Sequence, residues 1–339
     1  MRKLATIRKI DEILPIPDSD FLECAVIGGW KIVVRKEENY KINSLVIYCE
    51  IDSWIPTTIA PFLTKPDHFP KVFEGIEGER LKTARLRGQL SQGLILPIEI
   101  ALSRCGGWVE EDQDVSESLG IIKWEAPISA QLRGTVKGNF PTEIPKTDEE
   151  RVQNLKRDLN TWIEEDLLWE VTEKLDGTSC TFYLDLVDNF RVCSRNLELK
   201  ESEGNTYWEV ARKDNLENKM KEAQLQGLAI QGEIIGEGIQ KNRYNLKGHH
   251  FYVFKIYNIM TRKFLNPSER LNVCSELKLN HVPVLFSSPV KLPNSVENIL
   301  TIAEDKSILN EKTEREGIVF KCMENDNSFK AISNKFLLK

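Results

Sequence analysis

A stretch rich in proline and glycine separates two parts of the chain whose sequence patterns differ. The interrupting residues are Pro127, Gly134, Gly138, Pro141 and Pro145. These residue types break regular helices and strands, so the stretch at 126–148 is typical of a connection between domains. The chain has 339 residues, which is enough for two domains with separate hydrophobic cores. We therefore expect one domain at 1–125, a linker at 126–148 and a second domain at 149–339.

Before this stretch, short apolar runs alternate with turn signals. The runs that we expect to form strands are Leu4–Ile10, Phe21–Ile27, Lys31–Val34, Leu45–Glu50 and Gly93–Pro97. The Gly28-Gly29 and Asn43-Ser44 pairs supply turns between them. Short strands at this spacing predict a small all-β barrel in the first domain.

After the stretch, helical and strand patterns are mixed. The segment Asp148–Glu164 has a helical pattern, and Thr147 or Asp148 is suited to cap it. The apolar residues on its expected buried face are Val152, Leu155, Leu159 and Trp162. Beyond Leu168, strand-like runs surround the charged segment Tyr207–Gln226, which predicts a second helix. This mixture predicts an α+β domain.

Composition and charge exclude several classes of protein. The net charge of −6 disfavours nucleic-acid binding through bulk positive charge, although a local basic groove stays open. No apolar run approaches the roughly 18 residues of a membrane span. The first residues are charged where a signal peptide needs an apolar core, and the seven cysteines form no CxxC pair. We therefore expect an intracellular protein, cytoplasmic or nuclear, with reduced thiols and no membrane contact.

The most distinctive short segment is Glu173-Lys174-Leu175-Asp176-Gly177-Thr178-Ser179, which lies between two strand-like runs. A lysine at the end of a strand, directly before an Asp-Gly pair, is unusual for a solvated surface residue. A hairpin turn is the structural alternative, because Asp-Gly is a common turn dipeptide. The segment alone does not decide between a turn and a chemical site.

The remaining sequence adds a family resemblance. Lys-x-Asp-Gly resembles the nucleophile motif of covalent nucleotidyltransferases, the class of polynucleotide ligases and mRNA capping enzymes. Segments similar to that family's other motifs follow in its order. They are Ser194-Arg195-Asn196, Gly232–Gly236 around Glu233, Phe251–Ile256, Glu316–Lys321 and the segment containing Lys330. Six matches in order make the resemblance specific.

The resemblance extends to nearly the whole chain. Residues 81–97 (LKTARLRGQLSQGLILP) and 144–155 (IPKTDEERVQNL) look like RNA ligases of the Naegleria and Deinococcus type. That family joins an N-terminal OB domain to an α+β nucleotidyltransferase domain with the adenylyltransferase, ATP-grasp-like ligase fold. DNA ligases and capping enzymes carry their OB domain after the last motif. Here the barrel precedes the motifs and nine residues follow Lys330, so the resemblance favours an RNA ligase.

The resemblance implies a role for each motif residue. Lys174 would attack the α-phosphorus of ATP, with Lys321 and Lys330 supplying positive charge. Asp176, Glu233 and Glu316 would hold Mg²⁺ or Mn²⁺, directly or through water. The residues expected to contact the nucleotide are Glu173, Lys174, Ser179, Arg195, Asn196, Glu233, Phe254, Val319, Lys321 and Lys330.

Each of these assignments has a plainer alternative. The lysines could be solvated surface charges, the carboxylates salt-bridge partners, and Phe254 an ordinary core residue. Lys255 stands where many relatives carry aspartate, so the resemblance carries over no carboxylate role at that point, while the stacking role of Phe254 is unaffected. His249-His250 does not predict a metal site, because adjacent strand residues point to opposite faces.

The barrel carries a local basic run. Its members are Arg80, Lys82, Arg85 and Arg87. Their near-alternate spacing places charges on one face of an extended segment. We expect contact with RNA phosphates or with the pyrophosphate of ATP, because OB folds commonly bind single strands through basic grooves. A solvated face is the alternative.

The expected function is that of an ATP-dependent RNA ligase in RNA repair. It would seal 3′-hydroxyl and 5′-phosphate RNA ends through a lysyl-AMP and an RNA-adenylate, as a monomer. The sequence has no phosphate loop of a kinase and no HxT pair, so the ends would be prepared by another enzyme. The alternatives are a DNA ligase, a capping-type transferase, or a non-catalytic RNA-binding protein with a decayed transferase domain.

Overall fold

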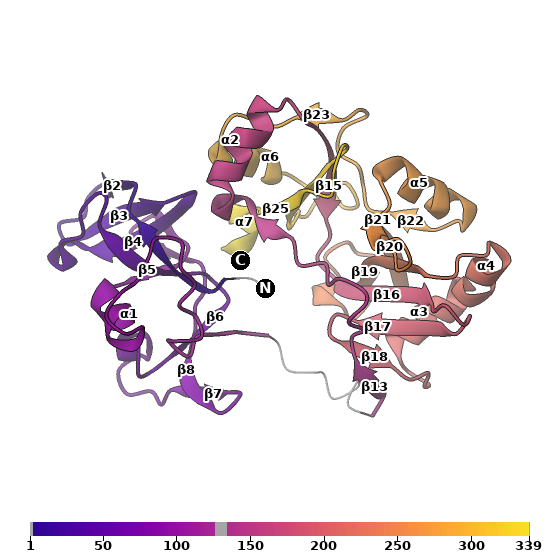
Figure 1. Ribbon diagram of the computed structural model, residues 1–339, viewed down its shortest axis with the longest axis horizontal. Helices are drawn as coiled ribbons and strands as arrows, with labels where there is room; N and C mark the ends of the chain where they lie inside the picture. The colour runs from indigo at the N-terminus through magenta and orange to yellow at the C-terminus, as the bar shows by residue number, and fades with distance from the viewer. Residues whose placement is uncertain (1–2, 126–133, 339) are drawn as a thin grey trace. The chain divides into compact units, whose positions relative to one another are not determined.

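The computed structural model describes residues 3–125 and 134–338 (Figure 1). Pro127 and the rest of 126–133 lie outside the described residues. The described chain forms two compact units. The first unit comprises residues up to 125, together with Gln153–Lys156 and Leu338. The second unit comprises residues 134–152 and Arg157–Leu337.

The first unit is built almost entirely of short strands. Its elements are β1 (Ala5–Lys9), β2 (Glu12–Pro15), β3 (Leu22–Ile27), β4 (Trp30–Arg35), β5 (Leu45–Cys49), β6 (Ser53–Pro56), β7 (Lys71–Phe73), β8 (Ile76–Arg80), β9 (Ala84–Leu86), β10 (Gln89–Ser91), β11 (Leu94–Leu96), α1 (Ile98–Arg104) and β12 (Ile122–Lys123). The sheets have the orders β1-β5-β11, β2-β3-β4 and β12-β6-β8-β7, with β9 and β10 as a separate hairpin.

The core of the first unit comes from alternating strand residues. Ile7 and Ile47 pack in one buried cluster, and Trp30, Ile32 and Tyr48 pack in another. Each apolar run that the sequence marked as a strand contains one: β1, β3, β4, β5 and β11. The prediction of an all-β first domain is confirmed.

The second unit mixes strands and helices. Its elements are β13 (Val136–Asn139), β14 (Glu150–Arg151), α2 (Lys156–Glu164), β15 (Leu168–Lys174), β16 (Thr178–Leu184), β17 (Phe190–Ser194), β18 (Leu197–Leu199), α3 (Thr206–Lys213), α4 (Leu216–Glu222), β19 (Leu228–Gly236), β20 (His249–Asn258), β21 (Lys263–Phe264), α5 (Pro267–Glu276), β22 (Asn280–His281), β23 (Val290–Lys291), α6 (Val296–Ala303), β24 (Gly317–Cys322), β25 (Ser328–Ile332) and α7 (Asn334–Leu337). This arrangement confirms the α+β prediction.

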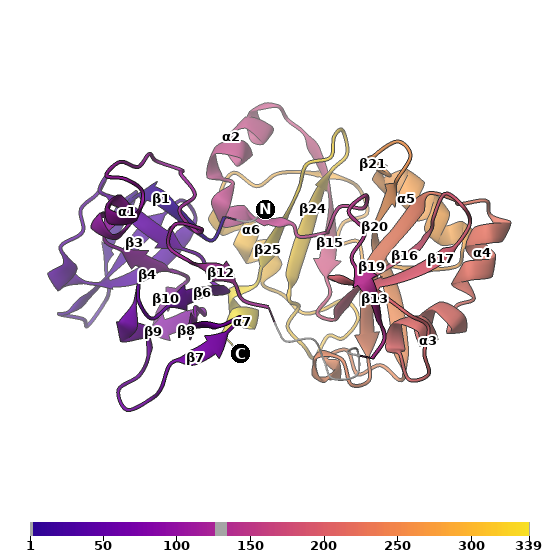
Figure 2. The same ribbon diagram turned by 60° about the horizontal axis from the view of Figure 1, so that its bottom comes forward.

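Two sheets organise this unit, and Figure 2 shows strands of both. The large sheet has the order β13-β18-β17-β16-β19-β20-β21, and β22 also pairs with β20. The small sheet has the order β14-β25-β24-β15-β23. Helices α3 and α4 cover one face of the large sheet, where Trp208 and Met220 pack with Phe182 and Phe251. On the small sheet, Trp162 of α2 stacks on Phe329 of β25.

The structure corrects two helix predictions. Helix α2 begins at Lys156, not at Asp148, because Glu150–Arg151 pairs with β25 as β14. Asn154 accepts a hydrogen bond from the Trp30 indole of the first unit, which holds this short connection outside the helix. The expected helix Tyr207–Gln226 is divided into α3 and α4. Asn215 separates them with a φ of 52°, in the left-handed region that ends a helix.

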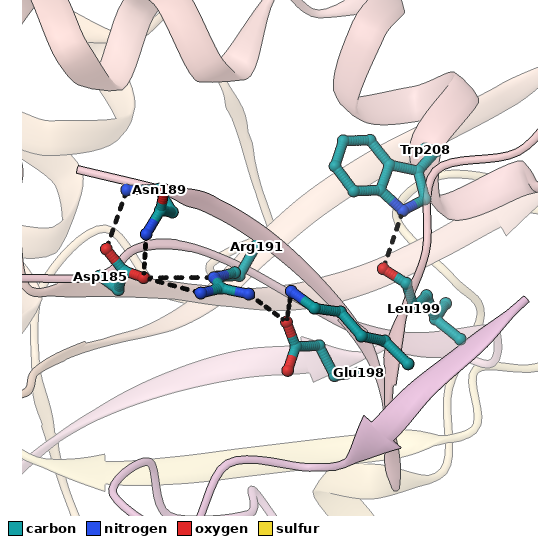
Figure 3. A network of polar contacts seen from close by, with 7 residues as sticks. Asp185, Asn189, Arg191, Glu198, Leu199 and Trp208 are labelled. Atoms are coloured by element: carbon teal, nitrogen blue, oxygen red, sulfur yellow. Dashed lines mark hydrogen bonds and ion pairs between the residues drawn. The ribbon is translucent and has the colours of Figure 1, made fainter. Parts of the chain in front are cut away.

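A polar network ties the outer strands of the large sheet together (Figure 3). Arg191 lies between Asp185 and Glu198, with nitrogen–oxygen distances of 3.1 and 3.0 Å. Asp185 also accepts from the Asn189 backbone N–H in the turn between β16 and β17. These charges are partly solvated and each has an opposite partner, so the network serves structure.

Two further sequence expectations concern cysteines and membranes. All seven cysteines are free thiols, and six of them are buried. No helix among residues 3–125 and 134–338 is long and apolar enough to cross a membrane.

Candidate active site

Lys174 is the last residue of β15, and its side chain meets the carboxylate of the residue directly before the neighbouring strand β24. β15 and β24 run antiparallel, with Lys174 opposite Gly317. This register places Glu316 beside the lysine, and Glu316 Oε1 lies 2.7 Å from Lys174 Nζ. A Cβ at position 317 would lie 2.2 Å from the Ala331 carbonyl oxygen. Glycine at 317 therefore permits the close strand packing that holds the pair.

The segment after Lys174 carries the chain from the small sheet into the large sheet, so it is not a hairpin turn. Gly177 lies against β19, where a Cβ would be 2.3 Å from a backbone oxygen. The backbone N–H of Asp176 donates to the Tyr244 hydroxyl at 2.6 Å. The Asp176 carboxylate lies 2.9 Å from Arg243 Nε. These contacts fix Asp176 at the junction of the two sheets.

Glu233 comes to the same place from the large sheet. It lies on β19 directly opposite Ser179 of β16, so both side chains project from the same face. Burial raises the pKa of Glu233 to about 8, and the nearby Glu316 and Asp176 carboxylates add to the rise. Burial and the Glu316 charge also raise the pKa of Asp176 to about 6. The site therefore concentrates negative charge that its protein partners compensate incompletely.

The charge on Lys174 is stabilised by this environment. Burial by itself would lower the pKa of the Lys174 amine. The charges of Glu316 and Glu233 outweigh burial and place the pKa above its ordinary value. In this state the amine is a cation and not a nucleophile. Additional positive charge among the carboxylates is needed to favour the neutral amine.

The donor set suits a hard divalent cation. Asp176, Glu233 and Glu316 offer carboxylate oxygens, which Mg²⁺ and Mn²⁺ prefer. Among the described residues, no three His, Cys, Asp or Glu side chains are grouped closely enough to ligate one ion together. Asp176 is already paired with Arg243, and Glu316 with Lys174. The arrangement fits an ion that keeps water molecules between itself and some of these oxygens.

Two further lysines lie on the same face of the small sheet as Lys174. Lys321 of β24 is opposite Glu170, and Lys330 of β25 is opposite Val319. Burial and the nearby Arg270 lower the pKa of Lys321 to about 7. Lys330 lies 3.2 Å from an oxygen of Asp148. The register thus places three lysines that are far apart in sequence on one face of the small sheet.

Arg195 and Asn196 follow β17 and meet the segment before β14. The other Asp148 oxygen lies 3.2 Å from Arg195 Nη2, so Asp148 bridges Arg195 and Lys330. Asn196 Oδ1 accepts from Lys146 Nζ at 2.8 Å. Asp148 therefore pairs with site residues and does not cap a helix, which corrects the sequence prediction.

Glu173 does not share the face of its neighbour Lys174. Successive strand residues project to opposite sides, and the buried Glu173 carboxylate accepts from the Ile308 backbone N–H at 2.8 Å. Burial raises its pKa. The structure therefore does not bring the side chains of Glu173 and Lys174 together, and nucleotide contact by Glu173 stays a prediction.

Phe254 lies at a bulge in β20. The register with β19 shifts between Gln231 and Gly232, which leaves Phe254 without an opposite residue. The ring is half-buried and packs against a cluster that contains Leu175, the residue after Lys174. Val319 is also half-buried. Their roles in stacking adenine stay predictions.

The basic run of the first unit is divided among different elements. Arg80 ends β8 and is fixed in the fold, because Nη2 lies 2.6 Å from Asp52 and the guanidinium lies 3.7 Å from the centre of the Trp124 ring. Lys82, Arg85 and Arg87 are exposed. Arg85 is in β9, and Arg87 has a φ of 48° in the following turn. The run is thus not one extended face, and Arg80 has a structural partner.

Several residues around the site were not predicted from the sequence. Arg243 forms an ion pair with Asp176, and the Tyr244 hydroxyl accepts from its backbone N–H. Arg270 of α5 lowers the pKa of Lys321. None of them belongs to a motif or a periodic pattern. Only the three-dimensional pairing shows their role.

Comparisons with known families agree with both units. A model of the RNA ligase family matches residues 167–332. A model of an OB-fold domain matches residues 4–98. Among curated proteins no match is found. The two family matches support an OB fold before an α+β ligase domain, as the resemblance implied.

Solved structures of Naegleria gruberi RNA ligase are similar over nearly the whole chain. A lysine-to-methionine variant with AMP and Mn is 43% identical, with a TM-score of 0.89 over 99% of this chain and 98% of that chain. A lysine-to-alanine variant with ATP and Mn has the same identity and coverage and a TM-score of 0.88. The same values hold for the enzyme with PPi.

Proposed function

Because the chain belongs to the RNA ligase family, we propose that it is an ATP-dependent enzyme that joins RNA ends through a lysyl-AMP on Lys174. The observation that carries the proposal is the setting of the Lys174 amine, 2.7 Å from Glu316 and close to the charges of Glu233 and Asp176. The related Naegleria enzyme has been solved with ATP and Mn, with AMP and Mn, and with PPi. These ligands correspond to the substrates and products of adenylyl transfer.

The first step is attack by Lys174 on ATP. The neutral amine forms a nitrogen–phosphorus bond to the α-phosphorus, the bond to the pyrophosphate oxygen breaks, and the amine loses one proton. A bound Mg²⁺ or Mn²⁺ would add positive charge that favours the neutral amine. Lys321 and Lys330 face the same side and compensate charge on the α-phosphate.

The second and third steps transfer and release AMP. The RNA 5′-phosphate attacks the lysyl-AMP and takes the adenylate, which restores Lys174. The RNA 3′-hydroxyl then attacks the activated 5′-phosphate, and AMP leaves as the phosphodiester forms. Arg195 and Lys330 lie at the two oxygens of one carboxylate, a spacing that also suits a phosphate group.

The remaining assignments complete the proposal. Phe254 and Val319 would enclose adenine, with Glu173, Ser179 and Asn196 as further nucleotide contacts. The enzyme would act as an intracellular monomer in RNA repair, on 3′-hydroxyl and 5′-phosphate ends prepared by another enzyme. Lys82, Arg85 and Arg87 of the OB-fold unit would contact phosphates, because their side chains are exposed.

The central test is replacement of the nucleophile. We expect Lys174→Met to abolish transfer of label from α-labelled ATP to the protein, because methionine has no amine. Lys291→Met is a matched control, since Lys291 is exposed and pairs with Asp166 away from the site. A labelled Lys174→Met protein would show that another residue is the nucleophile. An unlabelled wild-type protein would favour a non-catalytic RNA-binding role. Nicked duplexes with RNA or DNA on each side of the break then identify the substrate.

The basic residues of the first unit have a separate test. We expect Arg85→Ala/Arg87→Ala to weaken RNA joining several-fold and to reduce its salt dependence, with little effect on folding. Lys41→Ala/Arg104→Ala is the control, because it removes two other exposed cations from the same unit. Unchanged joining with unchanged salt dependence would exclude a role for Arg85 and Arg87 in RNA contact.

A further inference from the structure

A buried arginine outside the six motifs lies close to the site. Arg270 is in the middle of α5 and is only 1% exposed. Helix α5 lies beside β20 and β22 (Figure 1). Arginine is almost never fully buried without partners, because removing its charge from water is costly. The position therefore requires an explanation in the contacts that Arg270 makes.

Two partners hold the Arg270 guanidinium. Nη2 forms an ion pair with Glu170 Oε2 of β15. Nε donates to His281 Nε2 of β22 at 2.9 Å. His281 Nδ1 lies 2.5 Å from the Val282 carbonyl oxygen and donates to it, which leaves Nε2 as the acceptor. Burial and the Arg270 charge lower the pKa of His281 to about 3, so this ring is neutral.

The carboxylate that binds Arg270 is shared with Lys321. Lys321 Nζ lies 3.7 Å from the same Glu170 oxygen, farther than a direct hydrogen bond, and donates to Thr172 Oγ1 at 3.3 Å. Glu170 and Lys321 are each about 6% exposed. A carboxylate and a lysine in so dry a setting would form a tight pair if nothing competed. Arg270 is the competitor.

Other charged groups around Lys321 shift its pKa, some upward and some downward. Glu149, before β14, is 2.6 Å from Lys255 Nζ of β20. Lys255 and Arg270 lower the pKa of Lys321, whereas Glu170 and Glu149 raise it. Burial has the largest effect and lowers it. The cations around Lys321 therefore offset the rise in its pKa that the carboxylates cause.

We propose that Arg270 is a positioning residue for Lys321, which it keeps available for the nucleotide phosphate by holding the Glu170 carboxylate. Arg270 itself contacts no substrate, and the part of Lys321 in phosphate contact rests on the proposed function. Without Arg270, Glu170 would pair directly with Lys321 and turn its ammonium group away from the substrate. His281 supports the arrangement by accepting from Arg270 Nε, which fixes the plane of the guanidinium.

Kinetics of full-length variants test the proposal. We expect Arg270→Met to slow label transfer from ATP about 10- to 100-fold, as losing one electrostatic group does. In a Lys321→Met background the same change should cost less than about 2-fold, since the group that it positions is absent. Adding Glu170→Gln to Arg270→Met should restore much of the rate. Equal losses in both backgrounds, in proteins with the same melting temperature, would overturn the proposal.

A titration tests the same coupling without activity. With ¹³C-labelled lysine, the Cε signal of Lys321 reports its protonation. We expect its midpoint to rise by at least about one pH unit in Arg270→Met, because a cation is lost and Glu170 moves closer. An unchanged midpoint would contradict the proposal. If Arg270→Met does not fold, Arg270→Gln replaces it, since glutamine also removes the cation while its amide can still donate one hydrogen bond to Glu170 or His281. A wild-type protein that takes no label would contradict the proposed function, whereas this titration would still decide the coupling.

Discussion

One face of the small sheet carries a lysine near each end, and the pKa values of the two amines are shifted in opposite directions. At one end, Lys174 lies among Glu316, Glu233 and Asp176, and its pKa is raised. At the other end, Lys321 lies near Arg270, and its pKa is lowered to about 7. Burial acts in the same direction on both lysines. The difference teaches that neighbouring charges, and not burial alone, decide the pKa of a lysine at this sheet.

The opposite states suit different tasks. A carboxylate-rich end attracts divalent cations but keeps the nucleophile protonated until such a cation arrives. At the other end, the task proposed for Lys321 is contact with the nucleotide phosphate, and nearby cations there offset the carboxylates. Changing the charge at the carboxylate-rich end should therefore remove the difference between Lys174 and Lys321.

Metal removal should have the largest effect. We expect chelation with EDTA to reduce label transfer to Lys174 by about 10³-fold or more, because the carboxylates then hold the amine in its protonated form. Excess Mg²⁺ or Mn²⁺ should restore the rate. The measurement is the initial rate of adenylylation with α-labelled ATP. Full activity after exhaustive chelation would show that the carboxylates act without a metal ion.

The pH dependence of metal binding should show an intermediate effect. The pKa values of Glu233 and Asp176 are about 8 and about 6, so both carboxylates take up protons as the pH falls through that range. Protons compete with the cation, and the affinity for Mn²⁺ should therefore fall by up to roughly tenfold per pH unit from pH 8 to pH 6. Calorimetric titration measures it. In Glu233→Gln, the dependence near pH 8 should disappear, and its persistence would assign that proton to another group.

Stability should show the smallest effect. The folded-state pKa of Glu233 is about 8, above the unfolded value of about 4.3. The folded protein therefore binds the extra proton, and stability is lost as the pH rises between these values. We expect Glu233→Gln to raise the free energy of unfolding at pH 9 by about 1–2 kcal/mol while abolishing activity.

The outer network of the large sheet supplies the matched control for that prediction. Glu198 accepts from Arg191 and Lys137 and belongs to the partly solvated cluster of Figure 3. Glu198→Gln should leave label transfer unchanged and lower stability slightly, by about 0.5 kcal/mol. Denaturation with urea at pH 9 compares the two variants. A less stable Glu233→Gln protein would show that the Glu233 carboxylate is compensated in the fold.

Local patterns in the sequence were sufficient for much of the fold. Apolar runs located the first unit's strands, and the Lys174 motif and Glu316 proved to be neighbours. The expected helix from Asp148 was wrong because β25 pairs with Glu150–Arg151, a contact between residues far apart in sequence. Arg270 could not be found because nothing in the pattern of α5 distinguishes a buried arginine from an exposed one. Long-range pairing decides such positions.

The change of sheet at Gly177 has a mechanical consequence. Lys174 ends β15 and Glu316 directly precedes β24, so the pairing of these two strands holds the ion pair of Lys174 and Glu316 in place. Glu233 belongs to the large sheet, which the connection at 175–177 joins to the small sheet. Residues 282–285 form a second link, with backbone hydrogen bonds to Val253 of β20 and to Glu173 of β15. A ligand that contacts residues of both sheets would therefore add a further link between them. Part of its binding free energy would then appear as increased resistance of the two sheets to sliding past each other.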